Sequence, residues 1–295
     1  MKAVTFTAMG TGWWVACDVP ALLPGAEALV RAAEARLSRF DSASSLSRLN
    51  AARRVTDPLL AAVVRAALDL RDRTGGAFDP TLGARLAALG YDRDLADIGR
   101  PAPAAAWHPG DLGVRVVGDE VRLDGAGALD LGGVAKGFTV DRVVAALRGW
   151  GARRVLVDGG GDLRGAGGAW PIGVGDGLAV WTDAGAVATS STRRRRWRDQ
   201  GDRPLHHVLD PRTGWPAASP VRTAVVVAPD AATADGLATA LLVDAPGVVP
   251  RLAGLDAHAL LDVGAGGWWM TPGAPVAATT AAELVAVAVA AGEAP

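Results

Sequence analysis

The sequence predicts an α+β fold with mixed, largely antiparallel sheets and packed helices. Short β-type runs and amphipathic helical stretches alternate along the 295 residues, but without the regular strand–helix–strand spacing of a doubly wound sheet. The G-x-G-x-x-G pattern of a dinucleotide-binding crossover occurs nowhere in the chain. Hydrophobic residues make up 50% and charged residues 21%, a composition that indicates a globular protein rather than a disordered one.

Two amphipathic helices are predicted in the first half of the chain. Residues 25–39 carry apolar side chains at helical spacing with charged side chains between them. The second helix covers 57–73, where Asp57 supplies an N-cap and Pro58 the first helical position. The same periodicity predicts two later helices, over 136–148 and 231–243.

Strands are predicted where short apolar runs lie between turn residues. The first run, residues 3–18, contains a glycine break, and Gly118-Asp119 is typical of a hairpin turn. The later predicted strands are 113–117, 121–123, 155–157, 170–174, 178–182, 205–209 and 222–227. A strand at Trp268-Trp269 and a packing helix over 281–291 are expected near the end of the chain.

The length of the chain allows one large domain or two of ordinary size. We expect a core over residues 1–243 and a C-terminal α/β tail over 244–295 that completes the same domain. The stretch 100–112 is rich in Pro and Ala and is the expected internal linker.

Charge and cysteine content exclude several classes of protein. The 30 basic and 31 acidic residues give a net charge of -1, so the chain lacks the positive surface of a general nucleic-acid binder. Cys17 is the only cysteine, which excludes an internal disulfide framework and a cysteine-rich metal site. We therefore expect no nucleic-acid partner.

The start of the chain is apolar but does not match a targeting signal. Trp14 stands where a lipoprotein signal ending at Cys17 would have a small or aliphatic residue, and paired tryptophans favour a strand over a signal helix. No run of eighteen apolar residues is present, so no membrane span is predicted. We expect the protein to be cytoplasmic.

The segment from Asp130 to Gly137 combines two glycines, the start of a predicted helix and a lysine. Gly132 and Gly133 allow a ligand to approach the backbone, the helix N-terminus presents free N–H groups, and Lys136 adds a positive charge. These features suit a phosphate site, and the alternative is a glycine turn that only caps the helix. The Gly-Lys-Ser/Thr order of a P-loop is missing.

Two further motifs could supply a metal ligand set and a base. Asp235 and Thr239 are four residues apart on a predicted helix, so their oxygens share one face and could hold Mg²⁺, or could serve only as helix-terminal hydrogen-bonding groups. His206 and His207 end a predicted strand beside an Asp-Pro turn. Adjacent strand residues point to opposite faces, so at most one can be a general base in a given site.

Four consecutive arginines, Arg193 to Arg196, precede Trp197. This run could grip phosphates or RNA, but the net charge favours a solvated basic loop or a patch for one specific ligand.

In their order along the chain, these motifs resemble the ApbE family, the FAD:protein FMN transferases. The resemblance runs from Met9 to about Val243 and is strongest over Asp130–Asp141. It also covers Ala8–Thr11, Phe40–Asn50, Gly76–Thr81, Leu89–Tyr91, Val157–Asp162, Val187–Ser190, His206–Gly214 and Ala234–Ala240. Ser191 departs from the pattern, because many members have glycine there.

The resemblance implies an activity, namely protein flavinylation. The family moves the FMN moiety of FAD to a Thr or Ser hydroxyl of a target protein, releases AMP and requires Mg²⁺. The implied fold is a T-fold-like tandem arrangement with FAD in a cleft. The expected partners are therefore FAD and a flavin-acceptor protein.

The resemblance also implies roles for individual residues. His207 matches the catalytic histidine, with His206 as the alternate, and would take the proton from the acceptor hydroxyl. Asp235, Thr239 and the carbonyl of Ala135 would hold Mg²⁺. The expected FAD-binding residues are Met9, Asn50, Asp79, Tyr91, Gly132, Gly133, Lys136, Asp162 and Thr189.

Two other functions fit the same residues. A Mg²⁺-dependent FAD pyrophosphatase would use water in place of the protein hydroxyl and give FMN and AMP. A non-enzymatic FAD-binding protein would not need His207, Asp235 and Thr239 together.

Overall fold

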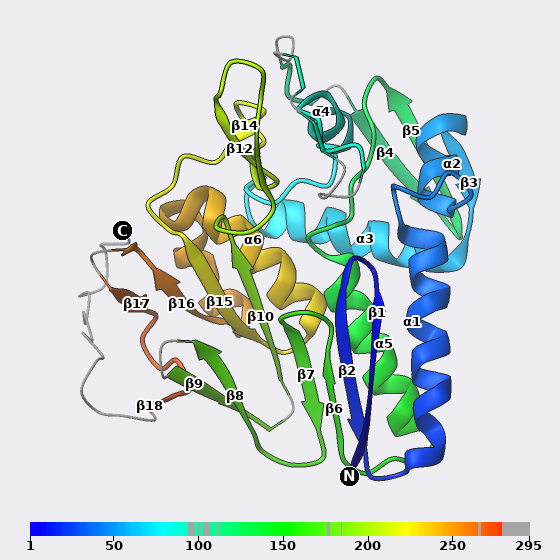
Figure 1. Ribbon diagram of the computed structural model, residues 1–295, viewed down its shortest axis with the longest axis vertical. Helices are drawn as coiled ribbons and strands as arrows, with labels where there is room; N and C mark the ends of the chain where they lie inside the picture. The colour runs from blue at the N-terminus through cyan, green and yellow to red at the C-terminus, as the bar shows by residue number, and fades with distance from the viewer. Residues whose placement is uncertain are drawn as a thin grey trace.

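A computed structural model describes residues 1–93, 98–99, 101–102, 107–110, 112–175, 178–183, 185–264 and 267–278. The largest sheet of these residues has eight strands in the order β1-β2-β6-β7-β10-β15-β16-β17, and every neighbouring pair is antiparallel (Figure 1). The strands are β1 (Lys2–Ala8), β2 (Thr11–Cys17), β6 (Val155–Asp158), β7 (Asp162–Ala166), β10 (Ala186–Ser191), β15 (Thr223–Ala228), β16 (His258–Asp262) and β17 (Trp268–Met270). The predicted α+β class with antiparallel sheets is confirmed.

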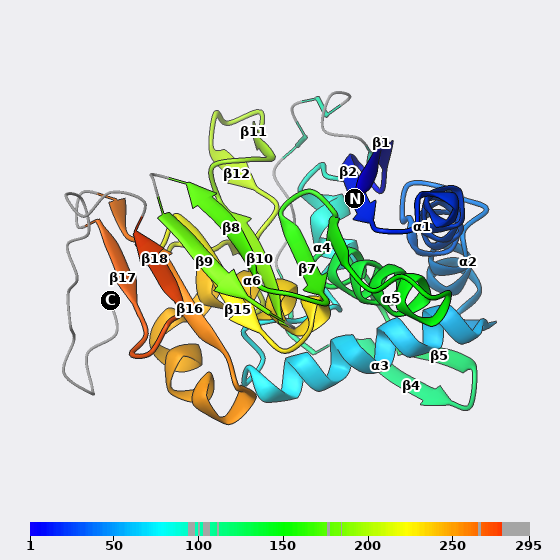
Figure 2. The same ribbon diagram turned by 90° about the horizontal axis from the view of Figure 1, so that it is seen from below.

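Helices α5 (Ala135–Gly149) and α6 (Ala231–Val248) pack on one face of this sheet (Figure 2). The two helices meet closely at Gly137, where a Cβ would lie 2.2 Å from the carbonyl oxygen of Ala231. Asp141 of α5 accepts hydrogen bonds from the first two N–H groups of α6, at Ala231 and Ala232. The position of α6 relative to α5 is therefore fixed at the end nearest Lys136.

Helix α6 is largely apolar, as expected of a helix that is buried on most of its surface. Residues Ala231–Arg251 are long and apolar enough to cross a membrane, but 72% of the apolar window is buried inside the structure. Its contacts with β10, β15, α5 and α3 (Pro58–Arg73) are those of a core helix.

A smaller sheet covers the opposite face of the large one. It contains β8 (Trp170–Gly175), β9 (Leu178–Thr182) and β18 (Val276–Ala278). Ile172 and Val180 of this sheet share a core with Val225 and Leu260 of the large sheet. Successive strand residues point to opposite faces, so Ala224 and Val226 of β15 belong to the core on the helical side.

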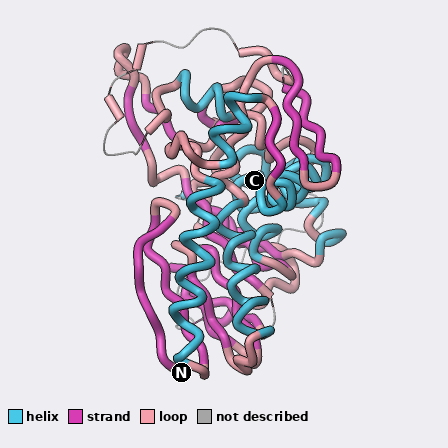
Figure 3. Tube along the Cα trace, turned by 90° about the vertical axis from the view of Figure 1, so that its right-hand side faces the viewer, coloured by secondary structure: helices cyan, strands magenta, loops and turns pink. Residues whose placement is uncertain are grey.

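Two of the remaining helices, over residues 45–52 and 58–73, pack against a three-stranded sheet. Helix α1 lies beside β1 and α5, in front of the strands in the side view of Figure 3. The helices are α1 (Leu23–Leu37), α2 (Ser45–Ala52), α3 (Pro58–Arg73) and α4 (Gly83–Ala88), and the sheet contains β3 (Arg54–Thr56), β5 (Glu120–Gly125) and β4 (Leu112–Val117). Asp57 caps α3 as the sequence predicts, by accepting from Leu59 and Leu60 N–H.

Two short ladders connect the layers near the cavity described below. They pair β11 (Arg196–Arg198) with β12 (Pro204–His206), and β13 (Leu209–Asp210) with β14 (Trp215–Pro216). Single 3-10 turns cover Pro20–Leu22, Val249–Arg251 and Ala253–Leu255.

The predicted elements differ from the structure at two places, and others fall outside the described residues. The single strand expected over 3–18 is a hairpin, because Met9 and Gly10 both have left-handed φ values, of 52° and 68°, and reverse the chain. The strand expected over 205–209 is interrupted after His206, so it contributes to two separate ladders. The helix expected over 281–291 and parts of the expected linker 100–112 lie outside the described residues.

Candidate active site

A cavity of about 670 Å³ opens where the helical layer meets the large sheet. Segments far apart in the sequence line it: the β1–β2 turn, the end of α1, the loop before α5, the end of β10, the segment after β12, and α6. Most of the predicted site residues lie in this lining, namely Met9, Asp79, Tyr91, Gly132, Gly133, Ala135, Lys136, Thr189, His207, Asp235 and Thr239.

Lys136 lies in the first turn of α5 between two buried carboxylates. Its Nζ is 2.6 Å from Asp162 Oδ2 and 3.3 Å from Asp235 Oδ2. Burial alone would lower the pKa of Lys136, but the two carboxylates outweigh it and raise the pKa. The cavity therefore keeps a positive charge beside the glycine loop at neutral pH.

Asp162 supports Lys136 from behind rather than lining the cavity. Asp162 is 2% exposed, and burial together with the nearby Asp235 raises the pKa of its carboxyl group, against the opposing effect of Lys136. This predicted FAD-binding residue therefore contacts Lys136, which lines the cavity, but is not part of the lining itself.

Asp235 and Thr239 lie one turn apart on α6, as predicted, and present oxygens to the cavity. Thr239 Oγ1 is 3.4 Å from Ser190 Oγ, and a Cβ at Gly133 would lie 3.1 Å from Thr239 Oγ1. A side chain at Gly133 would therefore crowd this hydroxyl.

These oxygens fit Mg²⁺, which prefers carboxylate, hydroxyl and carbonyl ligands and keeps part of its shell for water and phosphate. The Ala135 carbonyl also accepts from Thr139 Oγ1 at 2.7 Å. No group of three His, Cys, Asp or Glu side chains suited to a metal occurs among the described residues. An ion at this place would thus depend on Asp235, on Thr239 and on ligand oxygens.

His207 rather than His206 faces the cavity. His206 is the Cα partner of Arg196 in the β11–β12 ladder, and the following residue, His207, is in the lining. Burial, reinforced by the positive charges of Arg195 and Lys136, lowers the pKa of His207 to about 3. The imidazole is therefore neutral at neutral pH, which is the protonation state that a general base requires.

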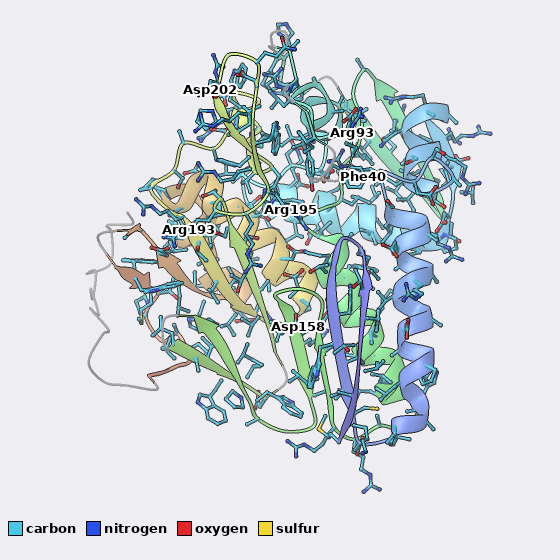
Figure 4. The ribbon with its side chains drawn as sticks, viewed as in Figure 1. Phe40, Arg93, Asp158, Arg193, Arg195 and Asp202 are labelled. Atoms are coloured by element: carbon cyan, nitrogen blue, oxygen red, sulfur yellow. The ribbon has the colours of Figure 1, made fainter. Side chains whose placement is uncertain are left out.

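Tyr91 belongs to a stack of aromatic and guanidinium groups at one side of the cavity. The Arg39 guanidinium lies 4.2 Å from the Phe40 ring centre and 4.5 Å from that of Tyr91, and the Tyr91 and Trp197 ring centres are 5.4 Å apart. Arg39 Nε also pairs with Asp130 Oδ2 at 2.5 Å. Phe40 is labelled in Figure 4.

Sequence reasoning missed the roles of Arg39 and of Glu34 in this lining. Glu34 Oε1 accepts from Met9 N–H at 2.5 Å and so holds the left-handed turn at Met9. Neither residue stands in a motif of its own, and both lie on or next to an ordinary amphipathic helix. Only the packing of α1 against the hairpin reveals their positions.

The remaining predicted site residues are Asp79, Thr189 and Asn50, and they form hydrogen bonds or ion pairs with other parts of the chain. Asp79 accepts from Thr81 Oγ1 at 2.7 Å and pairs with Arg71 at 3.2 Å, and Thr189 N–H donates to Gly161 O. Asn50 is not in the cavity lining. Its amide donates to Leu129 O at 3.0 Å and accepts from Leu129 N–H at 2.8 Å, which fastens α2 to the loop before α5.

The family model described as the ApbE family matches residues 9–260. The chain belongs to the ApbE family. It is 34% identical over 267 residues to the FAD:protein FMN transferase of Treponema pallidum, covering 77% of this chain and 72% of that protein. The corresponding protein of Haemophilus influenzae is 30% identical over 254 residues, covering 74% of this chain and 70% of that protein.

Solved structures of this family share the fold. The ApbE protein of Thermotoga maritima superposes with a TM-score of 0.77 at 28% identity, covering 88% of this chain and 94% of its own. The apo flavinyl transferase ApbE of Pseudomonas stutzeri gives a TM-score of 0.75 at 26% identity, covering 92% and 93%. The resemblance seen in the sequence motifs is thus confirmed.

Proposed function

We propose that this chain is a FAD:protein FMN transferase that moves the FMN moiety of FAD to a Thr or Ser hydroxyl of an acceptor protein. The observation that carries the proposal is the convergence of Lys136, His207 and the Asp235–Thr239 pair on one cavity. Relatives that match most of the chain bear the same enzyme name. The cavity volume of about 670 Å³ lies in the range of small-molecule and cofactor sites.

The glycine loop and Lys136 are suited to the pyrophosphate of FAD. Gly132 N–H donates to Asp130 Oδ1, which fixes the loop, and Lys136 brings a point charge to the same place. Phosphoryl transfer depends mainly on such positioning and charge neutralisation, because little other chemistry is required of the protein.

Asp235 and Thr239 would hold Mg²⁺ with the carbonyl of Ala135. A bound Mg²⁺ supplies charge neutralisation on the phosphate oxygens. Asp235 also contacts Lys136, so the same carboxylate positions the lysine and is available as a hard oxygen ligand.

His207 is the proposed general base. Its neutral imidazole takes the proton of the acceptor hydroxyl while the hydroxyl oxygen bonds to the FMN phosphorus. The bond from that phosphorus to the bridging oxygen breaks, and AMP leaves with the electron pair. The proton is then on His207, the FMN phosphoryl group on the acceptor oxygen, and the bridging oxygen on AMP.

Chromatography of FAD incubated with the protein tests the proposal. The incubations contain Mg²⁺ or a chelator, with or without a set of peptides that each carry one Thr or Ser. We expect Mg²⁺-dependent AMP together with peptide-bound FMN. AMP with free FMN, independent of peptide, would favour a pyrophosphatase, and unchanged FAD bound to the protein would favour a carrier.

The cytoplasmic location stays a prediction from the sequence. Cys17 is fully buried in β2 and its thiol donates to Val19 O, so this cysteine is a packed core residue in the structure.

A further inference from the structure

The four consecutive arginines after β10 have different surroundings. Arg193 pairs with Asp262 at 2.8 Å, and Arg196 is exposed on β11. Arg194 and Arg195 line the cavity, and of these two only Arg195 is half-buried. Figure 4 labels Arg193 and Arg195, with Arg195 in the middle of the molecule.

Arg195 lies beside the proposed base. Arg196 and His206 are Cα partners in the β11–β12 ladder. Arg195 directly precedes β11 and His207 directly follows β12, so both lie at the same end of the ladder, and both line the cavity. A backbone group of Arg195 lies close to the His207 imidazole, and the Arg195 charge also acts on Lys136. The guanidinium therefore belongs to the part of the cavity where the acceptor hydroxyl would react.

The Arg195 guanidinium has neither an ion pair nor a hydrogen bond to any residue in the part of the chain that the structure describes. Arg39, which lines the same cavity, differs because it pairs with Asp130 at 2.5 Å. A half-buried cation is costly unless an anion or a hydrogen-bond acceptor meets it. An anionic ligand in the cavity would supply that partner.

The turn that carries Arg195 is held in an uncommon conformation. Arg195 has a φ of 50°, in the left-handed region that side chains other than glycine rarely adopt. Ser191 Oγ accepts from Arg193 N–H at 3.2 Å and donates to Arg222 O at 3.0 Å. Ser191 replaces the glycine of many family members, so in this chain a hydroxyl fastens the turn.

We propose that Arg195 binds the phosphate on the FMN side of FAD. This inference rests on the proposed function. The guanidinium donates to a non-bridging oxygen of that phosphate, next to the hydroxyl that His207 deprotonates. The acceptor oxygen bonds to the phosphorus, the bond to the bridging oxygen breaks, and Arg195 offsets the negative charge on the phosphoryl oxygens during the transfer.

Flavin binding by two matched variants tests this role without requiring turnover. R195Q removes the cavity charge, and R196Q removes an exposed charge from the same run. Flavin fluorescence is titrated with FAD, FMN and riboflavin, which has no phosphate. For R195Q we expect FAD and FMN to bind about 10-fold or more weakly and riboflavin to bind as to the wild type. R196Q is expected to bind all three normally.

Three further measurements test the assignment of Arg195 to the FMN-side phosphate. R195K keeps the positive charge but lacks the planar guanidinium with its paired N–H donors. It should therefore bind FMN more tightly than R195Q and more weakly than the wild type. Competition with AMP, which carries the other phosphate, should be unaffected in R195Q. S191G should weaken FAD binding in the same direction as R195Q, because the turn loses the Ser191 hydroxyl.

Several results would overturn the inference. Normal FAD binding by R195Q would remove the proposed contact, and equal loss of riboflavin and FMN would show a structural role instead. Loss confined to AMP would place Arg195 on the other phosphate. A wild-type protein that binds FAD but transfers no FMN would contradict only the proposed function, whereas one that binds no FAD would contradict both proposals.

Discussion

The environment of His207 makes a pH-dependent contribution to stability. Its pKa is lowered to about 3 in the folded chain and has its ordinary value near 6.5 when unfolded. Between these values the unfolded chain binds a proton that the folded chain does not. The free energy of unfolding therefore falls as the pH falls, by up to about 1.4 kcal/mol per pH unit from this group.

His207→Asn should remove this contribution. Chemical denaturation between pH 6 and pH 4 is expected to show a shallower loss of stability in the variant than in the wild type. His108→Asn, a change at an exposed histidine outside the cavity lining, is the control and should keep the wild-type slope. Identical slopes for wild type and His207→Asn would show that the imidazole is not buried in its neutral form.

Asp235 should matter for metal binding more than other aspartates. Asp235→Asn replaces the one carboxylate of the proposed Mg²⁺ ligand set, so calorimetric titration is expected to show a loss of Mg²⁺ affinity of about 10-fold or more. Asp124→Asn changes an exposed aspartate on β5 and should leave the affinity unchanged. Unaltered Mg²⁺ binding by Asp235→Asn would exclude the proposed ligand set.

Among the helices, the crossing of α5 and α6 positions the site. Gly137→Ala would bring a Cβ to 2.2 Å from Ala231 O, so the helices must separate. We expect a loss of about 1–3 kcal/mol in the free energy of unfolding. Gly149→Ala on the same helix meets nothing within 4 Å and should stabilise by up to about 1 kcal/mol. Thermal denaturation compares the two, and equal effects would contradict the close crossing.

Long helices with a clear period were predictable, and so were short strands between turn residues, such as β9 and β15, but other short elements were not. The helices over 57–73 and 136–148 match α3 and α5 closely, because caps and apolar spacing are local signals. The six-residue α4 and the strand β16 carry too few residues for a period to be read. The sequence did not predict the hairpin turn at Met9, because the positive φ of this methionine depends on its contact with Glu34 in the folded chain.

Across the entire protein, the sequence located the site better than it described the contacts there. Motif residues such as Lys136, Asp235 and His207 meet in one cavity as the resemblance implied. Asn50 and Asp162 instead support neighbouring groups, because a motif does not say whether a polar side chain turns toward a ligand or toward its own fold. The place of Arg195 in the cavity, where its guanidinium has no ion pair or hydrogen bond to the described residues, emerged only from three-dimensional packing.

Intact-mass measurement of an acceptor peptide, incubated with FAD, Mg²⁺ and either wild type or His207→Asn, tests the proposed transfer most directly. The wild type should add the mass of one FMN moiety to a Thr- or Ser-containing peptide and release one AMP for each addition. His207→Asn should add none while still binding FAD. Equal labelling by both proteins, or AMP release without any labelled peptide, would contradict the proposed reaction.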